Sequence, residues 1–341
     1  MARTTCLLAL LGMAMLATAQ KCTREKGTTP MFEWLPTEAA PDRFPVHLIR
    51  GDLFFADGNS VYVPDGRDVA NGWGMRGSTH IVGEVEKPVP VRLELEWFSY
   101  TEDRFYQGAF ALPAEEMTAL FSAGVTDPLT GRLLGFERII VGMAPEGTVS
   151  VWMAAGAEVV EVASFLAPEV SLPWERVLKN PEVSREAFVR QVLEAKLGPE
   201  GLARLAREGV PKGLYQGYRK RYLWRPLVKG PGTPTGLWVR SFNGENSFIG
   251  PAGPAVARAS RPVPAEMQLD WIAPGSAALT AKVTFDEAEI FAAFAKLSRG
   301  EASHQLVLEI QVSRSGAAVS LRDETYILPL EKVRVDLFRG N

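Results

Sequence analysis

The sequence has few of the residues on which most enzymes and metal proteins depend. It contains two cysteines and three histidines, His47, His80 and His304. It has no C-x-x-C or H-E-x-x-H motif and no calcium-loop pattern, so the residues indicate no metal site and no cofactor. The G-x-S-x-G pentapeptide of common hydrolases is also missing. We therefore expect a protein that is not an enzyme.

A strong charge of one sign is missing as well. The formal net charge is -3, so no overall basic field points to nucleic acid or to an anionic membrane surface. One local exception is YQGYRKRYLW at residues 215–224, where aromatic residues alternate with Arg219, Lys220 and Arg221. The segment fits a junction helix or strand with a solvated basic face, or a surface for an acidic protein partner or lipid headgroups. We expect no nucleic-acid partner.

Long hydrophobic runs occur only at the N-terminus. Arg3 precedes an apolar stretch at residues 6–17, and Ala17-Thr18-Ala19 fits the small-residue rule for signal-peptide cleavage. About 12 apolar residues are too few to cross the roughly 30 Å of membrane hydrocarbon as a helix. We therefore expect residues 1–19 to be a signal peptide, a periplasmic location and no transmembrane segment in the mature chain.

Cys22 raises the alternative of a lipoprotein, because a cysteine just after an apolar leader can carry a lipid anchor. Lys21 disfavours that alternative, since lipoprotein processing requires a small residue before the cysteine. A soluble protein is the favoured interpretation, and Cys22 is then the only mature cysteine, which excludes an internal disulfide. Residues 20–43 have the composition of an extended arm.

An internal repeat is the main feature of the remaining chain. Residues 87–97 (KPVPVRLELEW) match residues 261–271 (RPVPAEMQLDW), and in both the apolar residues alternate up to Trp97 or Trp271. This period of two predicts a strand with one buried and one wet face. Residues 57–64 match 244–251 upstream, and residues 110–121 match 283–294 downstream. Three matches in the same order favour tandem units.

The predicted fold class is α+β, mostly antiparallel β, with two tandem sheet-plus-helix units joined by a helical connector. The first unit is expected at residues 44–172, the connector and hinge at 173–236, and the second unit at 237–341. Helices are predicted from Pro113, over residues 184–196 and 199–208, and from Asp286, where Ser184 and Asp286 serve as N-caps.

A glycine-rich loop in the first unit is the best candidate for a functional segment. Residues 64–83 contain NGWGMRG, whose G-x-G-x-x-G spacing does not indicate a nucleotide site, because no buried strand precedes it and no helix follows. The loop either presents or tucks in Trp73. His80, just after it, is the best candidate base, although a structural role is favoured because no partner motif accompanies it.

Exposed aromatic residues and arginines are preferred for a binding surface, because they dominate interface energetics. The candidate binding residues are Trp73, Met75, Arg76, Tyr100 and Arg104, all expected to be exposed. Trp97, Trp152 and Trp271 are instead expected in the core. The second unit has no counterpart of the long loop, so functional decoration is expected mainly in the first unit.

Several segments taken together resemble a family of bacterial envelope proteins, usually lipoproteins, of unknown function. They are PDRFPVHLIRGDLFFADGNSVYVP, NGWG, ELEWFSYTEDRFYQGAFALP, IIVGMAPEGTVSVWM and YRKRYLW, in this order between Phe44 and Trp224. The resemblance implies an export signal, a β-rich fold and no established catalytic residues. Some relatives are encoded beside type VI secretion phospholipase effectors. Lys21 before Cys22 departs from the lipoprotein pattern.

These observations predict a non-enzymatic periplasmic binding protein. The most concrete expectation, from the resemblance, is an immunity protein that binds a toxic lipase-type effector encoded nearby and blocks its active site. The alternative is an envelope protein that binds a small ligand or glycan through the same Gly/Trp loop. An unrecognised hydrolase is the third and least favoured alternative.

Overall fold

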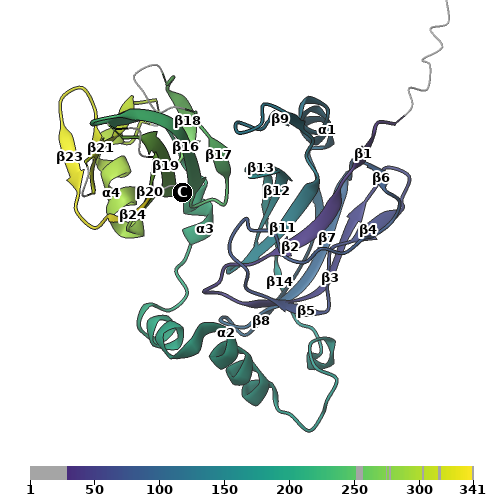
Figure 1. The fold of residues 1–341 in the computed structure, drawn as a ribbon. Helices are drawn as coiled ribbons and strands as arrows, with labels where there is room; N and C mark the ends of the chain where they lie inside the picture. Colours follow the sequence, from purple (N-terminus) through teal and green to yellow (C-terminus); the bar gives the residue numbers. More distant parts are fainter. Residues whose placement is uncertain are drawn as a thin grey trace, which may run out of the picture.

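The computed structural model describes residues 29–250, 256–273, 275, 278–301, 303–313 and 316–339. The predicted signal peptide and Cys22 lie outside these residues, so the signal peptide and the absence of a lipid anchor at Cys22 remain predictions. In the part of the chain that is described, no helix is long and apolar enough to cross a membrane. The fold is mostly antiparallel β-structure with a few helices (Figure 1).

The first unit, residues 31–170, is a sandwich of two sheets with one helix. One sheet has the order β2 (Leu35–Ala39), β11 (Arg138–Ala144), β12 (Thr148–Ala155), β13 (Glu158–Leu166). The other has the order β14 (Glu169–Val170), β8 (Arg104–Ala111), β7 (Arg92–Ser99), β3 (Val46–Phe54), β4 (Ser60–Tyr62), with β5 (Arg67–Val69) also on β3. The smaller elements are β1 (Met31–Glu33), β6 (Glu86–Pro88), α1 (Ala114–Ala123), β9 (Val125–Thr126) and β10 (Leu133–Leu134).

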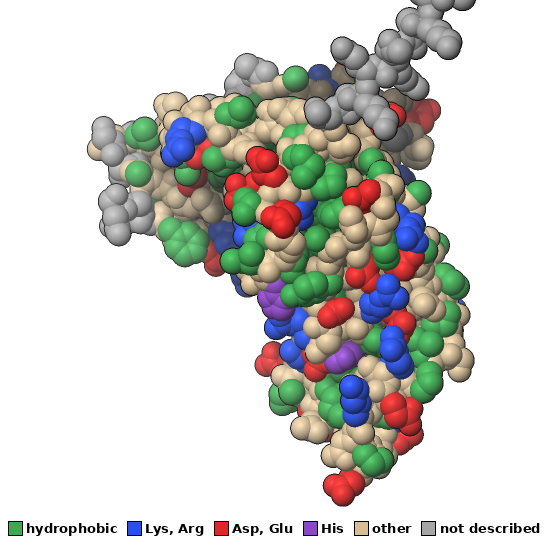
Figure 2. All heavy atoms as spheres, turned by 90° about the vertical axis from the view of Figure 1, so that its right-hand side faces the viewer, with side chains coloured by type: hydrophobic (Ala, Val, Ile, Leu, Met, Phe, Trp, Pro, Cys, Tyr) green, Lys and Arg blue, Asp and Glu red, His purple; other side chains and the backbone are tan. Residues whose placement is uncertain are grey.

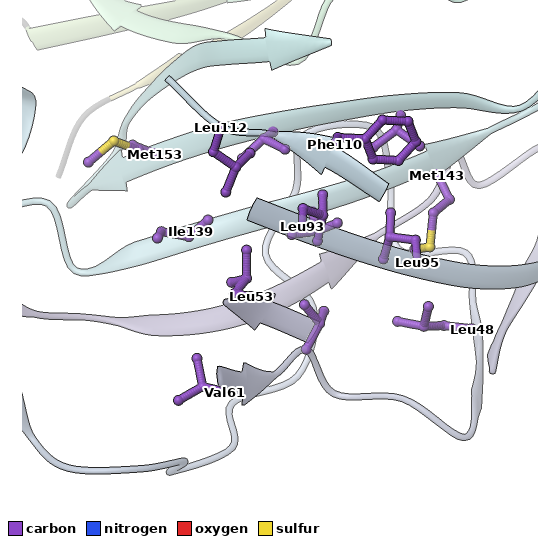
Figure 3. Packing of buried hydrophobic residues seen from close by; sticks show 14 of the residues in the cluster. Leu48, Leu53, Val61, Leu93, Leu95, Phe110, Leu112, Ile139, Met143 and Met153 are labelled. Carbon is purple, nitrogen blue, oxygen red and sulfur yellow. The ribbon is translucent and has the colours of Figure 1, made fainter. Parts of the chain in front are cut away.

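The core of the first unit lies between these two sheets. Leu93 and Leu95 of β7 point toward Ile139 and Met143 of β11 (Figure 3), and all four side chains are buried. Alternation along each strand places every second side chain on this inner face. Burying such apolar surface stabilises the folded state by roughly 25 cal/mol per Å² removed from water. The predicted burial of Trp97, Trp152 and Trp271 is confirmed, since all are at most 3% exposed.

The connector covers the outer face of β7 and β8. It consists of η1 (Trp174–Arg176), α2 (Arg185–Glu208) and α3 (Leu214–Tyr218). Phe188 and Val192 of α2 pack over Phe98 and Phe105. The prediction that the outer face of β7 is wet is therefore wrong beyond Glu94, because the connector buries it.

The helix predictions hold in detail. Ser184 caps α2, with its hydroxyl accepting a hydrogen bond from the N–H of Ala187 at 3.2 Å. Gly198, with φ of 64°, interrupts α2 just before Pro199, as the two predicted segments imply. Asp286 caps α4 (Glu287–Ser298) by accepting from the N–H of Glu289 at 2.9 Å.

The second unit, residues 221–339, also has two sheets. One has the order β17 (Asn246–Phe248), β16 (Thr233–Ser241), β19 (Pro264–Ile272), β20 (Ala278–Thr284), β24 (Arg334–Arg339). The other has the order β18 (Ala259–Pro262), β15 (Arg221–Lys229), β21 (Leu306–Val312), β22 (Ala317–Arg322), β23 (Ile327–Leu330). The helix α4 follows β20, as α1 follows β8.

Strand pairing in the second unit follows the order seen in the first. β16 pairs with β17 and β19, as β3 pairs with β4 and β7. β15 pairs in parallel with β21, as β2 pairs in parallel with β11. β20 pairs with β24, as β8 pairs with β14.

Each unit begins earlier in the chain than expected. The first begins in the predicted arm and the second in the predicted connector. In the first, Trp34 follows Phe32 by two positions and lies near Phe121 of α1; in the second, Trp224 follows Tyr222 and lies near Phe294 of α4. The expected extended arm at residues 20–43 therefore does not describe residues 31–39, because Trp34 is 1% exposed and β2 is a strand of the sandwich. Likewise β15, expected in the connector, belongs to a sheet of the second unit.

The two units meet through a continuous sheet of nine strands. Val159 of β13 pairs with Asn246 of β17, which joins the β11 sheet of the first unit to the β16 sheet of the second. In Figure 1 the units stand side by side, with α2 below them and α3 leading up into the second unit. The face of the first unit in Figure 2 mixes both signs of charge with scattered apolar side chains, so that face presents no single-sign field.

Candidate functional site

The junction between the units is built on an apolar face of the first unit. Ile140, Trp152 and Ala154 point out of the sandwich and are all fully buried, packed with the half-buried Trp73. The strands of the two units can be aligned by placing Trp34 on Trp224. In this alignment, Ile140 corresponds to Glu309, Trp152 to Ser320 and Ala154 to Arg322. There Glu309 forms ion pairs with Lys229 at 2.9 Å and with Arg322 at 3.0 Å. Only the first unit therefore carries an outer face suited to a second unit.

The glycine-rich loop runs along the free edge of β2 and is anchored there. The Asn71 amide oxygen accepts from the N–H of Ala40 at 3.1 Å, and its NH2 donates to the carbonyls of Glu38 and Met75 at 3.1 and 3.2 Å. The N–H of Gly77 donates to the Thr37 hydroxyl at 2.9 Å. An asparagine side chain thus supplies the hydrogen bonds that a neighbouring strand would make, which protects an exposed edge.

Trp73 wedges between the units. Its ring centroid lies 4.8 Å from those of both Trp152 and Tyr215. Gly74 has φ of 71°, and a Cβ on it would lie 2.6 Å from the carbonyl oxygen of Gly244. Glycine is therefore required where the loop touches the β16–β17 turn. The sequence left open whether the loop presents Trp73 to solvent or tucks it in. The structure shows its indole tucked in, against Trp152 and Tyr215.

Buried polar groups fix the same contact. The Trp152 indole N–H donates to the carbonyl of Asn243 at 3.0 Å, and the Asn243 amide donates to Glu161 at 3.3 Å. Arg219 also reaches Glu161 at 3.1 Å. Burial raises the pKa of Glu161, although Arg219 opposes the rise. Arg221 is paired nearby as well, with Glu245 at 2.9 Å.

A second carboxylate at the junction, that of Glu158, has fewer hydrogen-bond partners than that of Glu161. Glu158 of β13 accepts a hydrogen bond from the N–H of Phe248 at 3.2 Å. Burial raises the pKa of Glu158 to about 7, and the nearby Glu245 adds to the rise. The charge of this group therefore changes near neutral pH, where the two units meet.

Tyrosines of α3 and one arginine close the opposite side of the junction. Arg43 forms an ion pair with Glu287 of α4 at 3.5 Å. Tyr215 and Tyr218 are 5% exposed, and burial raises the pKa of each phenol above its usual value. Tyr218 stacks on Phe291 of the second unit at 5.6 Å. Together these groups tie the connector to both units.

Two open cavities flank the glycine-rich loop. One has a volume of about 630 Å³ and lies over the outer face of β16, β19 and β20; the other, of about 660 Å³, lies toward Tyr215 and Asp286. Both are lined by Met75, Arg240 and Glu266, so the loop stands between them. We call the first the sheet groove. Its volume is within the about 300–1,000 Å³ typical of small-ligand sites.

Three of the five predicted binding residues come together at this place. Met75 is 42% exposed and lies at the border of the two cavities. Arg76 lines the sheet groove and forms an ion pair with Glu137 at 2.9 Å. Trp73 lies behind them in the junction, so its predicted exposure is only partial.

The other two predicted residues lie elsewhere. Tyr100 is 1% exposed, packs among the aromatic residues under α2, and donates from its hydroxyl to Asp68 at 2.6 Å. The prediction that Tyr100 is exposed is therefore wrong, because the connector covers it. Arg104 is exposed and forms an ion pair with Glu169 at 3.0 Å. Neither residue lines a cavity of the junction.

Each histidine has a local partner, and no two lie together. Nδ1 of His47 is 2.7 Å from Asp68, Nε2 of His304 is 3.2 Å from Asp323, and Nδ1 of His80 is 3.5 Å from the hydroxyl of Tyr62. Burial raises the pKa of Asp68, but hydrogen bonds from His47 and Tyr100 outweigh it and lower the pKa. Among the described residues no group of three His, Cys, Asp or Glu side chains could hold a metal ion.

Comparison with known families gives a match over more than half of the chain. A family model described as "Protein of unknown function (DUF2931)" matches residues 17–213. The chain belongs to this family. The match takes in the first unit and most of the connector, and the second unit lies beyond its end. No curated protein and no solved structure matches the chain.

The floor of the sheet groove was missed from the sequence. Trp238 and Arg240 of β16 line it, together with Gln268 and Lys282 of the neighbouring strands. Functional residues had been expected mainly in the first unit, whereas this cavity is lined by residues of both units. The signal available was a strand whose outward positions hold a tryptophan and an arginine, at residues 238 and 240.

Proposed function

We propose that this member of the DUF2931 family is a non-enzymatic periplasmic binding protein whose contact surface is centred on Met75 and Arg76. The observation that carries the proposal is the anchoring of the glycine-rich loop on both sides of these two side chains. Before them, Asn71 ties the loop to β2 and Trp73 fixes it in the junction; after them, Gly77 and Ser78 bond to the side chains of Thr37 and Glu38. A preorganised contact loses little conformational entropy on binding, which favours affinity.

For the partner we propose a toxic effector of the lipase type, which this protein would bind and block as an immunity protein. Support comes from the resemblance to envelope proteins encoded beside type VI secretion phospholipase effectors. A methionine and an arginine suit such a contact, since both are enriched at protein interfaces. The effector would be blocked by occlusion of its active site, because an interface formed by the Met75 loop covers a patch of the effector surface rather than a single group.

The test begins with the neighbouring genes. Periplasmic expression of a neighbouring effector should stop growth, and co-expression of this protein should restore it and yield a stable complex. Replacing Met75 and Arg76 together by Ala should weaken the complex at least ~10-fold, since hot-spot residues cost more than about 1 kcal/mol each. A matched control is Met31→Ala, which changes a methionine that is 47% exposed in β1.

The outcomes separate two faces of the first unit. Loss of binding in Arg104→Ala, with the Met75 and Arg76 variant unaffected, would move the contact to the turn between β7 and β8. A chain whose neighbouring gene products are all harmless in the periplasm would overturn the immunity role.

We also infer that the two units arose by internal duplication. Support comes from the matching order of strand pairing and from the two aromatic groups, Phe32, Trp34 and Phe121 in one unit and Tyr222, Trp224 and Phe294 in the other. An experimental structure should superpose the units with these groups in register. Groups that fall out of register would count against a common origin.

A further inference from the structure

An aromatic side chain and a cation share one face of β16 in the sheet groove. Trp238 and Arg240 are two positions apart on this strand, so both point out of the second unit. Both line the groove. The contact surface proposed above is centred on Met75 and Arg76, which line the same groove but belong to the first unit, whereas Trp238 and Arg240 belong to the second unit and have no part in that proposal.

Trp238 is held as a platform by its aromatic neighbour. Its ring centroid lies 5.2 Å from that of Phe248 on β17, and Trp238 is half-buried. Gly236 leaves room for Phe248, since a Cβ there would lie 3.0 Å from its ring. A fixed indole with an accessible part can stack against the apolar face of a ligand without large entropy loss.

Arg240 is the cation of the groove that has no carboxylate partner within the described ranges. Three cations line the groove, but Arg76 is paired with Glu137 at 2.9 Å and Lys282 with Glu266 at 2.9 Å. Glu266 lies opposite Arg240 in the strand register, yet it turns to Lys282. The contact found for the Arg240 guanidinium is the sulfur of Met75, at 3.5 Å. The groove therefore has one uncompensated positive charge.

Two amides complete the polar lining. The NH2 group of Asn246 donates to the carbonyl of Ala157 at 2.7 Å, which leaves its oxygen as an acceptor. The NH2 group of Gln268 is 3.5 Å from Asp270, a distance at which a hydrogen bond is weak. Both amides therefore have capacity to bind hydroxyl groups of a ligand.

We propose that the sheet groove binds a saccharide that carries a carboxylate. A sugar ring has one apolar C–H face for Trp238 and several hydroxyls for Asn246 and Gln268. A single carboxylate satisfies the bidentate donors of Arg240. A neutral sugar would leave Arg240 unpaired, whereas a polyanion would bring more charge than the groove can neutralise.

The decisive experiment compares two sugars that differ by the acid. N-acetylmuramic acid carries a lactyl carboxylate that N-acetylglucosamine lacks, and binding of each to the full chain is measured by calorimetry. A charge-assisted hydrogen bond contributes about 1.5–3 kcal/mol, so the acidic sugar should bind at least ~10-fold more tightly. Arg240→Gln should remove this preference, and Trp238→Ala should weaken both sugars.

Control variants keep the proposal falsifiable. Trp238→Phe retains an aromatic ring and should bind better than Trp238→Ala at equal thermal stability. Arg190→Gln changes an exposed arginine of α2 away from the groove and should bind like the unchanged protein. Equal affinity for both sugars, binding of neither, or tighter binding of an acidic tripeptide than of the acidic sugar would each overturn the proposal. None of these results depends on the effector complex, which is tested by Met75 and Arg76.

Discussion

At the scale of single residues, Trp73 has the largest structural role in the glycine-rich loop. It belongs to two hydrophobic clusters, one with Trp152 and one with Tyr215, and these clusters join the first unit, the connector and the second unit. The same indole that sequence reasoning regarded as a contact residue thus holds the parts together.

Replacing Trp73 by Ala should lower the free energy of unfolding by about 2–4 kcal/mol, because a large and partly buried aromatic side chain leaves a cavity. Denaturant titrations measure the loss. Tyr326→Ala is the control, since Tyr326 is 59% exposed and its truncation should cost under about 0.5 kcal/mol. Equal effects of the two changes would contradict the assigned role of Trp73.

Glu158 makes the stability of the junction depend on pH. Because burial raises the pKa of Glu158 to about 7, the folded protein holds this proton more tightly than the unfolded chain does. The resulting stabilisation is complete below the ordinary glutamate pKa of about 4.3, and it is lost as the pH rises through 7.

Glu158→Gln should therefore be more stable than the unchanged protein at pH 8, by on the order of 1–3 kcal/mol, and nearly equal to it at pH 4. The glutamine oxygen can still accept from the N–H of Phe248, so the packing is retained. Unfolding titrations at both pH values provide the measurement. A difference that stays constant with pH would show that the Glu158 charge is not the cause.

At the scale of elements, the loop from Asn71 to Ser78 acts as a substitute for an edge strand. The buried carboxylate of Glu38 receives hydrogen bonds from both the N–H and the hydroxyl of Ser78, at 3.0 and 2.8 Å. With the bonds of Asn71, these contacts cover the side of β2 that faces away from β11. The loop follows this edge from Ala40 back to Thr37.

Asn71→Ala should destabilise the protein by about 1–3 kcal/mol, because the N–H of Ala40 and the carbonyl of Glu38 lose their partner. Hydrogen exchange at Met75 and Arg76 should accelerate in parallel, since the loop is freed. Asn180→Ala serves as the control, as Asn180 is exposed and accepts one local bond from Glu182. Unchanged exchange in the loop would refute the anchoring role.

At the scale of the whole molecule, the two units are unequal partners. The outer face of the first unit is apolar at Ile140, Trp152 and Ala154, whereas the matching positions of the second unit are polar. A terminal unit with a polar outer face stops further stacking, as capping repeats do in repeat proteins. The two outer faces therefore differ in their capacity to pack against another sheet.

A chain shortened to residues 29–213 should expose this apolar face, bind a hydrophobic dye and aggregate. Introducing the second unit's residues by Ile140→Glu, Trp152→Ser and Ala154→Arg should restore a soluble fragment. Light scattering and dye fluorescence provide the readouts. A shortened chain that is soluble without these changes would contradict the dependence of the first unit on the second.

Sequence reasoning located the strands and helices well where periodicity was strong. The caps at Ser184 and Asp286 and the break between the two predicted helical segments, at Gly198, all appear as expected. It failed for β2 and β15, which contain Pro36 and Pro226 and fell within the expected arm and the expected connector. Each strand is recognised only from its parallel partner, which is distant in the chain: Leu35 pairs with Arg138, and Trp224 pairs with Leu306.

The amino-acid sequence alone determined which residues alternate, which cap helices and which loop is rich in glycine, because these depend on near neighbours in the chain. Only the tertiary structure decided what those residues face. Tyr100 is buried because a distant helix covers it, Trp73 is tucked because a second unit packs beside it, and Met75 meets Arg240 across the junction. Such contacts join residues far apart in the sequence, so no local pattern specifies them.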